Sequence, residues 1–370
     1  MDLITILHTI DSIEPGGAET VFVDLATRLP NDKYRSIIVI DGKGWIYDQL
    51  SIRGIKPIIV NTKGSFNLRY LMTLMTIIRK ENIDLIQSHL LGSNVYSSLA
   101  GLLTRTPVVA TFHGVADITE NERFIRAKTF IINIGARCVI AVSKSLRSDL
   151  INRVKIRKEK IDVIYNGIIT SDFDREISSD IRDSYGWAKN DVIVGSLGNI
   201  HPNKGYDILI KAAGLLKHTE ITFRFVIAGQ IKAGLYDALL KLRSSLGLED
   251  RVHFLGFFED PAHFLSNIDI FLLTSTSEGF SIATIQAMAA NLPVIVTKCG
   301  GPEEIIDNNV NGCLIESENP EAIAKSIFLI SLNKELQKSL SKNGRKYVKD
   351  KFELSVMLNA YKEVYCKMTR

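Results

Sequence analysis

The stretch Thr274–Ala290, TSTSEGFSIATIQAMAA, follows the apolar run Ile268–Leu273 and joins a strand-like segment to a helix-like one. Gly279 lets the backbone approach a ligand closely, because glycine carries no Cβ atom. Ser281 can cap the helix, whose first amides have no partner inside the helix and attract anions. The segment therefore predicts a strand–loop–helix unit with a possible phosphate site at the start of the helix.

Two polar side chains flank that helix start. Glu278 stands just before the helix, and Gln286 lies one turn beyond Ile282 on the same face. Glu278 could reach sugar hydroxyls while the amides around Ile282–Thr284 hold a phosphate, so this segment could grip both ends of a nucleotide-sugar. An ordinary strand-to-helix connection with surface Glu and Gln is the alternative, since a short motif alone does not fix function.

Size and composition favour a globular protein of two domains. A chain of 370 residues with 46% hydrophobic content can bury a sizeable core. We expect a cytoplasmic protein, because no apolar run reaches the roughly 18 residues that span a bilayer and the start, Leu3–Ile10, lacks the basic preface of a signal peptide. The net charge of +4 is too small to indicate nucleic acid, and no basic-aromatic module occurs. The spacing of the four cysteines suits neither zinc nor a redox dithiol, which predicts reduced thiols at Cys138, Cys299, Cys313 and Cys366.

Short aliphatic runs alternate with longer amphipathic stretches almost from end to end, which predicts parallel sheets covered by helices. In the first half the expected strands are Leu3–Thr9, Ser36–Ile40, Pro57–Asn61, Asp84–Ser88, Val108–Phe112, Cys138–Val142 and Asp162–Tyr165. In the second half they are Val192–Leu197, Thr222–Ala228, Val252–Leu255, Ile268–Leu273, Pro293–Thr297 and Gly312–Ile315.

The polar segment Asn166–Asp191 is the best domain boundary. We expect an α/β protein with two doubly wound domains, residues 1–166 and 167–351, and a C-terminal helix from about 352 to 370 that docks back on the first domain. Ligands of such sheets bind at the carboxyl ends of the strands, so we expect a shared cleft there.

Several loops that follow strands in the first half could carry chemistry. Gly16 and Gly17 precede a helix and permit a tight turn that brings backbone N–H groups to a phosphate, although a plain loop is as good an interpretation. His113 ends an apolar strand just before a glycine, where active sites of this architecture gather. His89 and Asn94 follow the preceding strand and could hydrogen-bond an acceptor, with helix capping and packing as the equal alternative.

The second half opens with a comparable loop, Gly198–Gly205. Its Lys204 supplies a positive charge that could stabilise a diphosphate leaving group as charge develops on it. Gly229 ends the next strand and could line the same cleft.

Two further features bear on metals and membranes. Asp172 and Asp174 form a D-x-D in the polar linker, but two carboxylates alone seldom hold Mg²⁺ firmly, so we expect no metal. The segment Lys144–Lys160 carries seven Lys or Arg against two acidic residues. A solvated surface explains such a run, and a basic patch that rests on anionic lipid is the other interpretation.

Taken together, the ordered motifs resemble the retaining glycosyltransferases of the GT-B fold, specifically glycosyltransferase family four, also described as group 1. The resemblance runs nearly the full length and rests on PGGAE (15–19), SHLLGSN (88–94), TFHG (111–114), AVSKS (141–145), YNGI (165–168), GNIHPNKG (198–205), RVHFLGF (251–257), SEGFSIATIQA (277–287) and GGPEEI (300–305). It implies transfer of a sugar from a nucleotide-diphosphate donor, UDP- or GDP-linked, to a saccharide or lipid-linked saccharide, with the anomeric configuration kept and no bound metal or other cofactor.

The resemblance also implies roles for single residues. Glu278 would hold the donor sugar, Lys204 would neutralise the diphosphate, and His113 would contact the sugar or stabilise charge near the reacting carbon. His89 and Asn94 would face the acceptor. The remaining donor contacts would come from Gly16, Gly17, Asn199, Gly229, Gly279, Phe280, Ser281, Ile282 and Gln286, with the base near Phe254–Phe258 and so beside Phe257.

Two positions depart from the family pattern, which usually has Glu at Gln286 and commonly Arg at Asn199. Passing from Glu to Gln loses about 1 kcal/mol of hydrogen bonding, and losing a guanidinium from a diphosphate costs roughly 1.5–3 kcal/mol. A non-catalytic subunit with a decayed donor site is therefore the second hypothesis. An NAD-dependent enzyme is the third, disfavoured because G-x-G-x-x-G is absent after the first strand.

Overall fold

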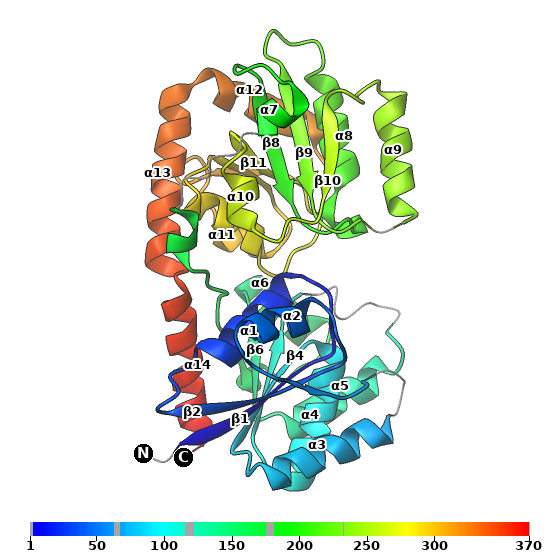
Figure 1. The fold of residues 1–370 in the computed structure, drawn as a ribbon, viewed down its shortest axis with the longest axis vertical. Coiled ribbons are helices and arrows are strands. Elements are labelled where there is room, and N and C mark those ends of the chain that lie inside the picture. Colours follow the sequence, from blue (N-terminus) through cyan, green and yellow to red (C-terminus); the bar gives the residue numbers. More distant parts are fainter. Residues whose placement is uncertain (1–2, 63–66, 115–121, 175–180, 232, 370) are drawn as a thin grey trace. The chain divides into compact units, whose positions relative to one another are not determined.

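The computed structural model describes residues 3–62, 67–114, 122–174, 181–231 and 233–369. The chain divides into two compact units, which we describe separately (Figure 1). Unit 1 comprises Met1–Asn166 and Ser355–Arg370, and unit 2 comprises Gly167–Leu354.

Unit 1 is built on a sheet of seven strands in the order β3-β2-β1-β4-β5-β6-β7, and every pairing is parallel. The strands are β1 Ile4–Ile10, β2 Tyr34–Ile40, β3 Ile58–Ile59, β4 Leu85–His89, β5 Val108–Phe112, β6 Cys138–Ala141 and β7 Ile161–Val163. The helices are α1 Gly17–Arg28, α2 Trp45–Ile52, α3 Leu68–Lys80, α4 Leu91–Thr104, α5 Ile125–Gly135, α6 Lys144–Asn152 and α14 Leu354–Met368, with a 3₁₀ turn at Lys158–Lys160.

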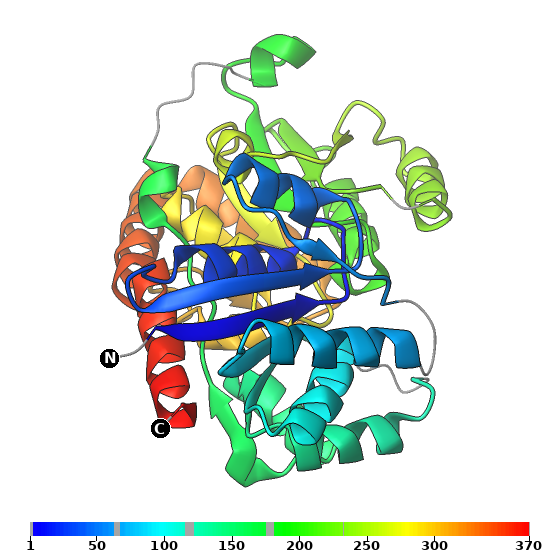
Figure 2. The same cartoon turned by 60° about the horizontal axis from the view of Figure 1, so that its bottom comes forward.

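Alternation along the strands of unit 1 assigns side chains to two separate apolar layers. In β2, Ile38 and Ile40 join a buried cluster with α1 and α2, whereas Val39 joins the cluster formed with α3 and α4. Successive side chains of a strand point to opposite faces, so both faces of this sheet must be covered. Figure 2 shows this arrangement, with α1 on one face and α3 and α4 on the other.

Helix α14 returns to unit 1 from the far end of the sequence. Its Tyr361 and Tyr365, one turn apart, are 1% and 0% exposed. Both hydroxyls contact side chains of the central strands: Tyr361 lies 3.2 Å from Thr111 Oγ1, and Tyr365 donates to Gln87 Oε1 at 3.0 Å. The helix is therefore part of the polar interior of unit 1 as well as a cover.

Unit 2 repeats the architecture with six parallel strands in the order β10-β9-β8-β11-β12-β13. The strands are β8 Val192–Leu197, β9 Phe223–Ala228, β10 Val252–Gly256, β11 Ile270–Leu273, β12 Val294–Thr297 and β13 Cys313–Ile315. The helices are α7 Ile181–Tyr185, α8 Tyr206–Leu215, α9 Leu235–Ser245, α10 Pro261–Leu265, α11 Ile282–Ala289, α12 Pro320–Leu332 and α13 Lys334–Lys351, with 3₁₀ turns at Thr170–Phe173, Pro202–Lys204 and Gly301–Glu304.

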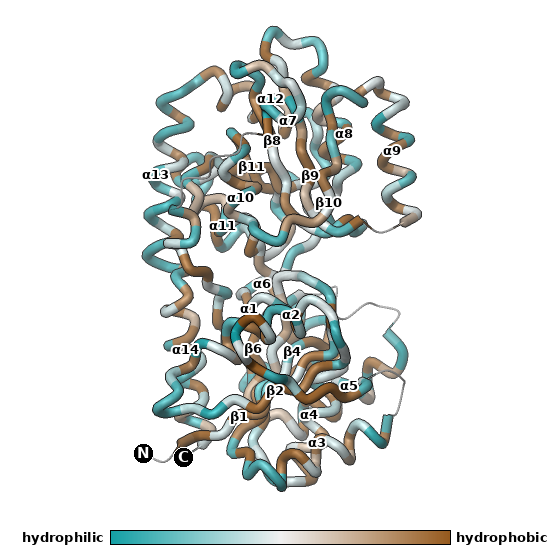
Figure 3. The backbone as a smooth tube through the Cα atoms, viewed as in Figure 1, coloured by the Kyte–Doolittle hydropathy of each residue, from teal (hydrophilic) through white to brown (hydrophobic). Residues whose placement is uncertain are grey.

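The prediction of two parallel, helix-covered sheets is confirmed, and each predicted strand has a counterpart. Figure 3 shows the reason, since the strands are mostly hydrophobic along their length while α13 is largely hydrophilic. A strand buried on both faces reads as an unbroken apolar run. The motif GGPEEI contains one 3₁₀ turn, Gly301–Glu304.

Close packing of α4 against α5 yields a stability prediction. A Cβ atom at Gly135 would lie 2.2 Å from the Ser98 carbonyl oxygen, a backbone atom that cannot move aside cheaply. We expect Gly135→Ala to lower the free energy of unfolding by about 1–3 kcal/mol, the usual cost of overpacking. Urea unfolding measures this change in the free energy of unfolding. The matched control is Gly42→Ala, where the nearest atom is 3.9 Å away. Equal unfolding midpoints for the two variants would contradict the close approach.

Candidate functional site

The carboxyl ends of β4 and β5 bring two predicted residues together in unit 1. His89 ends β4, His113 follows β5, and His89 Nδ1 lies 2.8 Å from His113 Nε2. The rings are stacked, with centroids 5.1 Å apart. Burial lowers the pKa of His113 to about 3 and holds that of His89 well below its usual range. Both imidazoles are therefore neutral at physiological pH.

Asn94 has a different role from the one expected of an acceptor ligand. It is fully buried, its side-chain nitrogen donates to the Thr111 carbonyl at 3.0 Å, and its oxygen accepts from the Ser88 hydroxyl at 2.7 Å. These bonds tie α4 to the ends of β4 and β5. The structure thus favours the packing alternative for Asn94. His89 also lies inside, with no exposed surface.

The loop of Gly16 and Gly17 leads into α1 as expected, but an acidic side chain lies against it. A Cβ at Gly16 would stand 2.3 Å from Glu19 Oε2, so this carboxyl group folds back over the start of the helix. Burial raises the pKa of Glu19, while a hydrogen bond from Ser12 opposes that rise. The place where we expected a phosphate is next to the protein's own carboxyl group.

In unit 2 the loops after β8 and β11 meet through an ion pair. Lys204 Nζ lies 2.7 Å from Glu278 Oε1, and the Ser275 hydroxyl donates to the same oxygen at 2.7 Å. The side chains of Lys204 and Glu278 are 26% and 12% exposed, so water screens this pair less than it screens a surface pair. A cation and a carboxylate predicted to act on opposite ends of one ligand are thus held side by side.

Backbone contacts fix that pair in place. The Thr276 amide donates to the Asn203 carbonyl at 2.8 Å, and the Thr274 hydroxyl donates to the Lys204 carbonyl at 2.9 Å. Gly205 has a φ of +61°, and a Cβ there would lie 2.2 Å from the Thr274 carbonyl oxygen. Only glycine fits this close approach without strain. The glycine after Lys204 is what lets the two loops touch.

The start of α11 has the geometry predicted from the sequence. Ser281 Oγ accepts from the Thr284 amide at 3.3 Å and caps the helix. The remaining first-turn amides have no partner within the helix and carry the positive end of its dipole. A Cβ at Gly301 would lie 2.4 Å from the Gly279 carbonyl oxygen, so the loop after β12 packs directly on the loop before α11.

The other predicted donor contacts fall into two groups. Phe280 is buried, and its ring packs on Phe352 with centroids 5.2 Å apart, so its side chain serves packing. Asn199 Oδ1 accepts from the Gln230 amide at 3.0 Å and links the loops after β8 and β9. By contrast, the side chains of the second group keep exposed surface: Gln286 on α11 is half-buried, and Phe257 is 45% exposed.

Gly229 lies where the loops after β8, β9 and β10 converge. Its amide donates to the Gly256 carbonyl at 2.8 Å, and a Cβ there would stand 2.0 Å from the Gly198 carbonyl oxygen. The exposed Phe257 ring follows directly after Gly256. Gly229 is predicted from the sequence as a donor contact, and its contacts show that it lets these loops approach one another.

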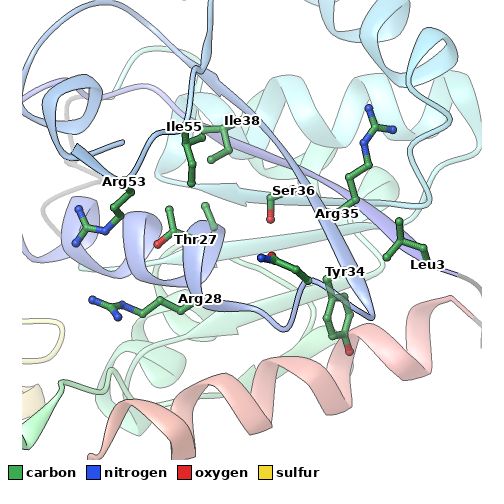
Figure 4. Close-up of a pocket in the computed structure, with 11 residues that line it drawn as sticks. Leu3, Thr27, Arg28, Tyr34, Arg35, Ser36, Ile38, Arg53 and Ile55 are labelled. Atoms are coloured by element: carbon green, nitrogen blue, oxygen red, sulfur yellow. The ribbon is translucent and has the colours of Figure 1, made fainter. Parts of the chain in front are cut away.

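A cavity of about 620 Å³ in unit 1 lies away from these residues, at the amino ends of β1 and β2 (Figure 4). Its lining includes Arg28, Arg35, Ser36 and Arg53. Arg28 and Arg35 already pair with carboxylates at 2.8 and 2.6 Å, and Figure 4 shows the three guanidinium groups turned away from Ser36. None of the predicted site residues lines this cavity.

The described residues show neither a cluster that could hold a metal ion nor a helix that could span a membrane. Asp174 of the D-x-D pairs with Arg345 of α13. Over the described residues, no group of three or more His, Cys, Asp or Glu is arranged to hold a metal ion. Within the same ranges, no helix combines the length and the apolar composition needed to cross a bilayer.

Comparison with known proteins gives matches to two described families. The family described as "Glycosyltransferase Family 4" matches residues 15–172, and "Glycosyl transferases group 1" matches residues 178–347. An Escherichia coli UDP-Gal:alpha-D-GlcNAc-diphosphoundecaprenol alpha-1,3-galactosyltransferase is 24% identical over 95% of this chain and 94% of its own length.

Solved structures show the same fold. A glycosyltransferase from Rickettsia africae superposes with a TM-score of 0.87 at 27% identity, covering 100% of both chains. Anabaena HepE in complex with UDP and glucose gives a TM-score of 0.88 at 25% identity, over 98% of this chain and 100% of that one. Because the two family matches follow one another along the chain and the fold agrees throughout, the protein belongs to the group 1, family 4 glycosyltransferases with the GT-B fold.

Proposed function

We propose that this glycosyltransferase moves a sugar from a nucleotide-diphosphate sugar to a saccharide or lipid-linked saccharide, with retention of configuration and without a metal ion. The observation that carries the proposal is the Lys204–Glu278 pair beside the start of α11. A cation, a helix start and a carboxylate lie on one edge of the unit 2 sheet. They match the diphosphate and the sugar hydroxyls of such a donor.

The UDP-bound Anabaena structure supports a nucleotide-sugar donor, and we extend this to UDP- and GDP-sugars. When the donor binds, Lys204 would exchange part of its contact with Glu278 for the diphosphate. Glu278 would then accept hydrogen bonds from sugar hydroxyls. Such an exchange costs little, because each charge gains a new partner as it gives up the old one.

The proposed reaction breaks one bond to the anomeric carbon and forms another. The bond between the anomeric carbon and the phosphate oxygen breaks, and the nucleoside diphosphate leaves with the bonding electrons. The acceptor hydroxyl oxygen forms the new bond on the same face, which keeps the configuration, and its proton passes to the leaving phosphate. Lys204 and the amides of α11 would stabilise the negative charge that develops on the leaving group.

The function is tested by turnover measured with a panel of UDP-, GDP- and ADP-sugars and saccharide or lipid-linked acceptors. We expect one donor class to be consumed, with proton NMR showing the α-anomer in the product of an α-linked donor and activity kept in excess EDTA. An inverted product would contradict retention. Loss of activity in EDTA that Mg²⁺ restores would contradict the metal-free account. Donor binding without turnover would support the non-catalytic alternative.

Lys204 and Glu278 provide the sharpest mutational prediction. We expect Glu278→Gln to leave the fold intact and lower turnover about 10²-fold or more, the scale of losing one preorganised charge contact. Lys204→Ala should both weaken donor binding and slow transfer, because its charge is needed most in the transition state. Steady-state kinetics and calorimetry with the donor measure the two effects.

A second Lys–Glu pair of unit 2 serves as the control. Lys298 pairs with Glu316, and their side chains are 42% and 70% exposed. Lys298→Ala and Glu316→Gln should keep turnover near wild type, since exposed pairs contribute little. If the Lys204 and Glu278 variants resemble these controls, the diphosphate and the sugar bind elsewhere.

Gln286 tests the clearest departure from the family pattern. If it meets the ribose, Gln286→Glu should keep or improve nucleotide affinity, because a carboxylate accepts stronger hydrogen bonds. The gain should stay within about tenfold in Kd. Gln286→Ala should weaken the nucleotide without abolishing transfer. Calorimetry with the nucleotide tests this role. If the alanine variant binds the nucleotide as tightly as wild type, Gln286 is a plain helix-surface residue.

We also propose that unit 1 rests on an anionic membrane surface through the basic run. Lys144, Arg153, Lys155, Arg157 and Lys158 are all exposed. The Asn133 side chain bonds the Lys155 carbonyl and the Arg157 amide, both at 3.0 Å, which places this run beside α5. On α5, Phe130 and Ile134 lie one turn apart and are 63% and 40% exposed. Basic and apolar side chains together suit a lipid surface.

Vesicle sedimentation tests the membrane proposal. Wild type should bind vesicles that contain anionic lipid, bind neutral ones weakly, and dissociate as salt rises. A triple change of Lys155, Arg157 and Lys158 to Glu should abolish binding, at about 1 kcal/mol per basic residue removed. The matched control changes three exposed lysines of α13, Lys338, Lys342 and Lys349, to Glu. Equal loss in both triple variants would show only a general charge effect and contradict this face.

A further inference from the structure

A continuous line of buried polar side chains runs through unit 1 from α14 to His113. On β4, Gln87 and His89 are two residues apart, and on β5, Thr111 is two residues before His113. His89 pairs in register with Thr111, so all four lie on one face of the sheet. That face is covered by α14, whose Tyr365 reaches Gln87. Of these four residues, His113 is the one to which the family resemblance gives a catalytic role.

The hydrogen-bond directions along the line follow from the chemistry of each group. Tyr365 donates its hydroxyl proton to Gln87 Oε1 at 3.0 Å. Gln87 Nε2 then faces three atoms: the Ser88 carbonyl at 3.2 Å, Thr111 Oγ1 at 2.9 Å and His89 Nε2 at 3.2 Å. A carbonyl oxygen can only accept, so the Ser88 carbonyl favours nitrogen on this side of the carboxamide, and the Tyr365 hydroxyl favours oxygen on the other side.

The orientation of Gln87 determines where both imidazoles carry their protons. An amide nitrogen cannot accept a hydrogen bond, so an N–H at His89 Nε2 would have no acceptor on Gln87, and the single proton of neutral His89 lies on Nδ1. His89 Nδ1 donates across 2.8 Å to His113 Nε2, so the proton of neutral His113 also lies on Nδ1. The opposite tautomer of His89 would set two N–H groups against each other.

The burial of the groups along this line also indicates that both imidazole rings are neutral. Gln87, His89 and Thr111 have no exposed surface, and Tyr365 is likewise fully buried. The Phe22 ring packs edge-on against His89 with centroids 5.5 Å apart, which prevents His89 from rotating away. A charged imidazolium in this setting would bear a heavy desolvation cost.

We propose that Tyr365 and Gln87 are positioning residues that act through His89 to hold His113 in its Nδ1–H form. His113 is then a neutral imidazole of fixed orientation and takes no part in proton transfer. This inference rests on the proposed function through the role that the family resemblance implies for His113, but the tautomer assignment rests on unit 1 alone. The C-terminal helix thereby acts on the site through a hydroxyl group.

The test combines a spectroscopic readout with kinetics. Two-bond ¹H–¹⁵N spectra of the full chain with labelled histidine distinguish Nδ1–H from Nε2–H rings, and His→Gln variants assign the seven signals. In wild type we expect His89 and His113 to be neutral and protonated at Nδ1. An Nε2–H form of either ring in wild type would overturn the proposal, whether or not the protein transfers sugar.

Two variants change the line at different points. Tyr365→Phe keeps the ring and removes the proton donated to Gln87, so we expect a mixture of His89 and His113 tautomers and a fall in kcat of about tenfold, with donor KM little changed. Gln87→Glu places an acceptor beside His89 Nε2, so we expect His113 to move to its Nε2–H form and kcat to fall up to about 10²-fold.

The matched control is Tyr34→Phe. Tyr34 is a buried tyrosine whose ring packs on Tyr365 with centroids 6.3 Å apart, but whose hydroxyl contacts Cys366 and lies outside the line. It should leave the histidine spectrum and kcat unchanged. If Tyr365→Phe gives wild-type kcat and tautomers, the proposal is wrong. If Gln87→Glu fails to fold, Tyr365→Phe and the wild-type spectrum still decide. If tautomers change as expected while His113→Ala transfers sugar normally, the catalytic role of His113 fails and the positioning role with it.

Discussion

The contact between Lys204 and Glu278 is the interaction on which the proposed donor site depends. It joins the loops that follow β8 and β11, where Gly205 lets the backbone pass close to Thr274. Opposite charges that are largely shielded from water attract strongly, and neither can be left alone without cost. In the proposed function, donor binding would exchange partners at this pair, with the diphosphate and the sugar each replacing one protein charge.

In our proposal, unit 1 holds the neutral imidazole of His113 in one orientation. The sheet brings His89 and His113 together, and the register of β4 and β5 stacks Gln87 and Thr111 behind them. Because these groups are buried, each must find a partner, and α14 supplies the hydroxyl that completes the set. Helix α14 thus completes the hydrogen bonds of the buried polar groups in unit 1.

Much of this could be predicted from sequence, and the limits have physical reasons. Largely apolar runs located the thirteen strands of the described residues, because most of these strands are covered on both faces. The segment after β11 gave Glu278 and the cap at Ser281, because these depend on local spacing. The buried role of Asn94 and the carboxyl of Glu19 over Gly16 depend on partners that spacing does not reveal. The bond from Tyr365 to Gln87 spans 278 residues, and no local pattern encodes it.

The most direct test of the account is a crystal structure of the full chain with the nucleoside diphosphate of its preferred donor. The account predicts that the diphosphate lies within about 3 Å of Lys204 Nζ and of amide nitrogens at the start of α11. It also predicts that Glu278 Oε1 no longer shares Lys204 as its main partner. A diphosphate bound elsewhere, with the Lys204–Glu278 contact unchanged, would contradict the central claim.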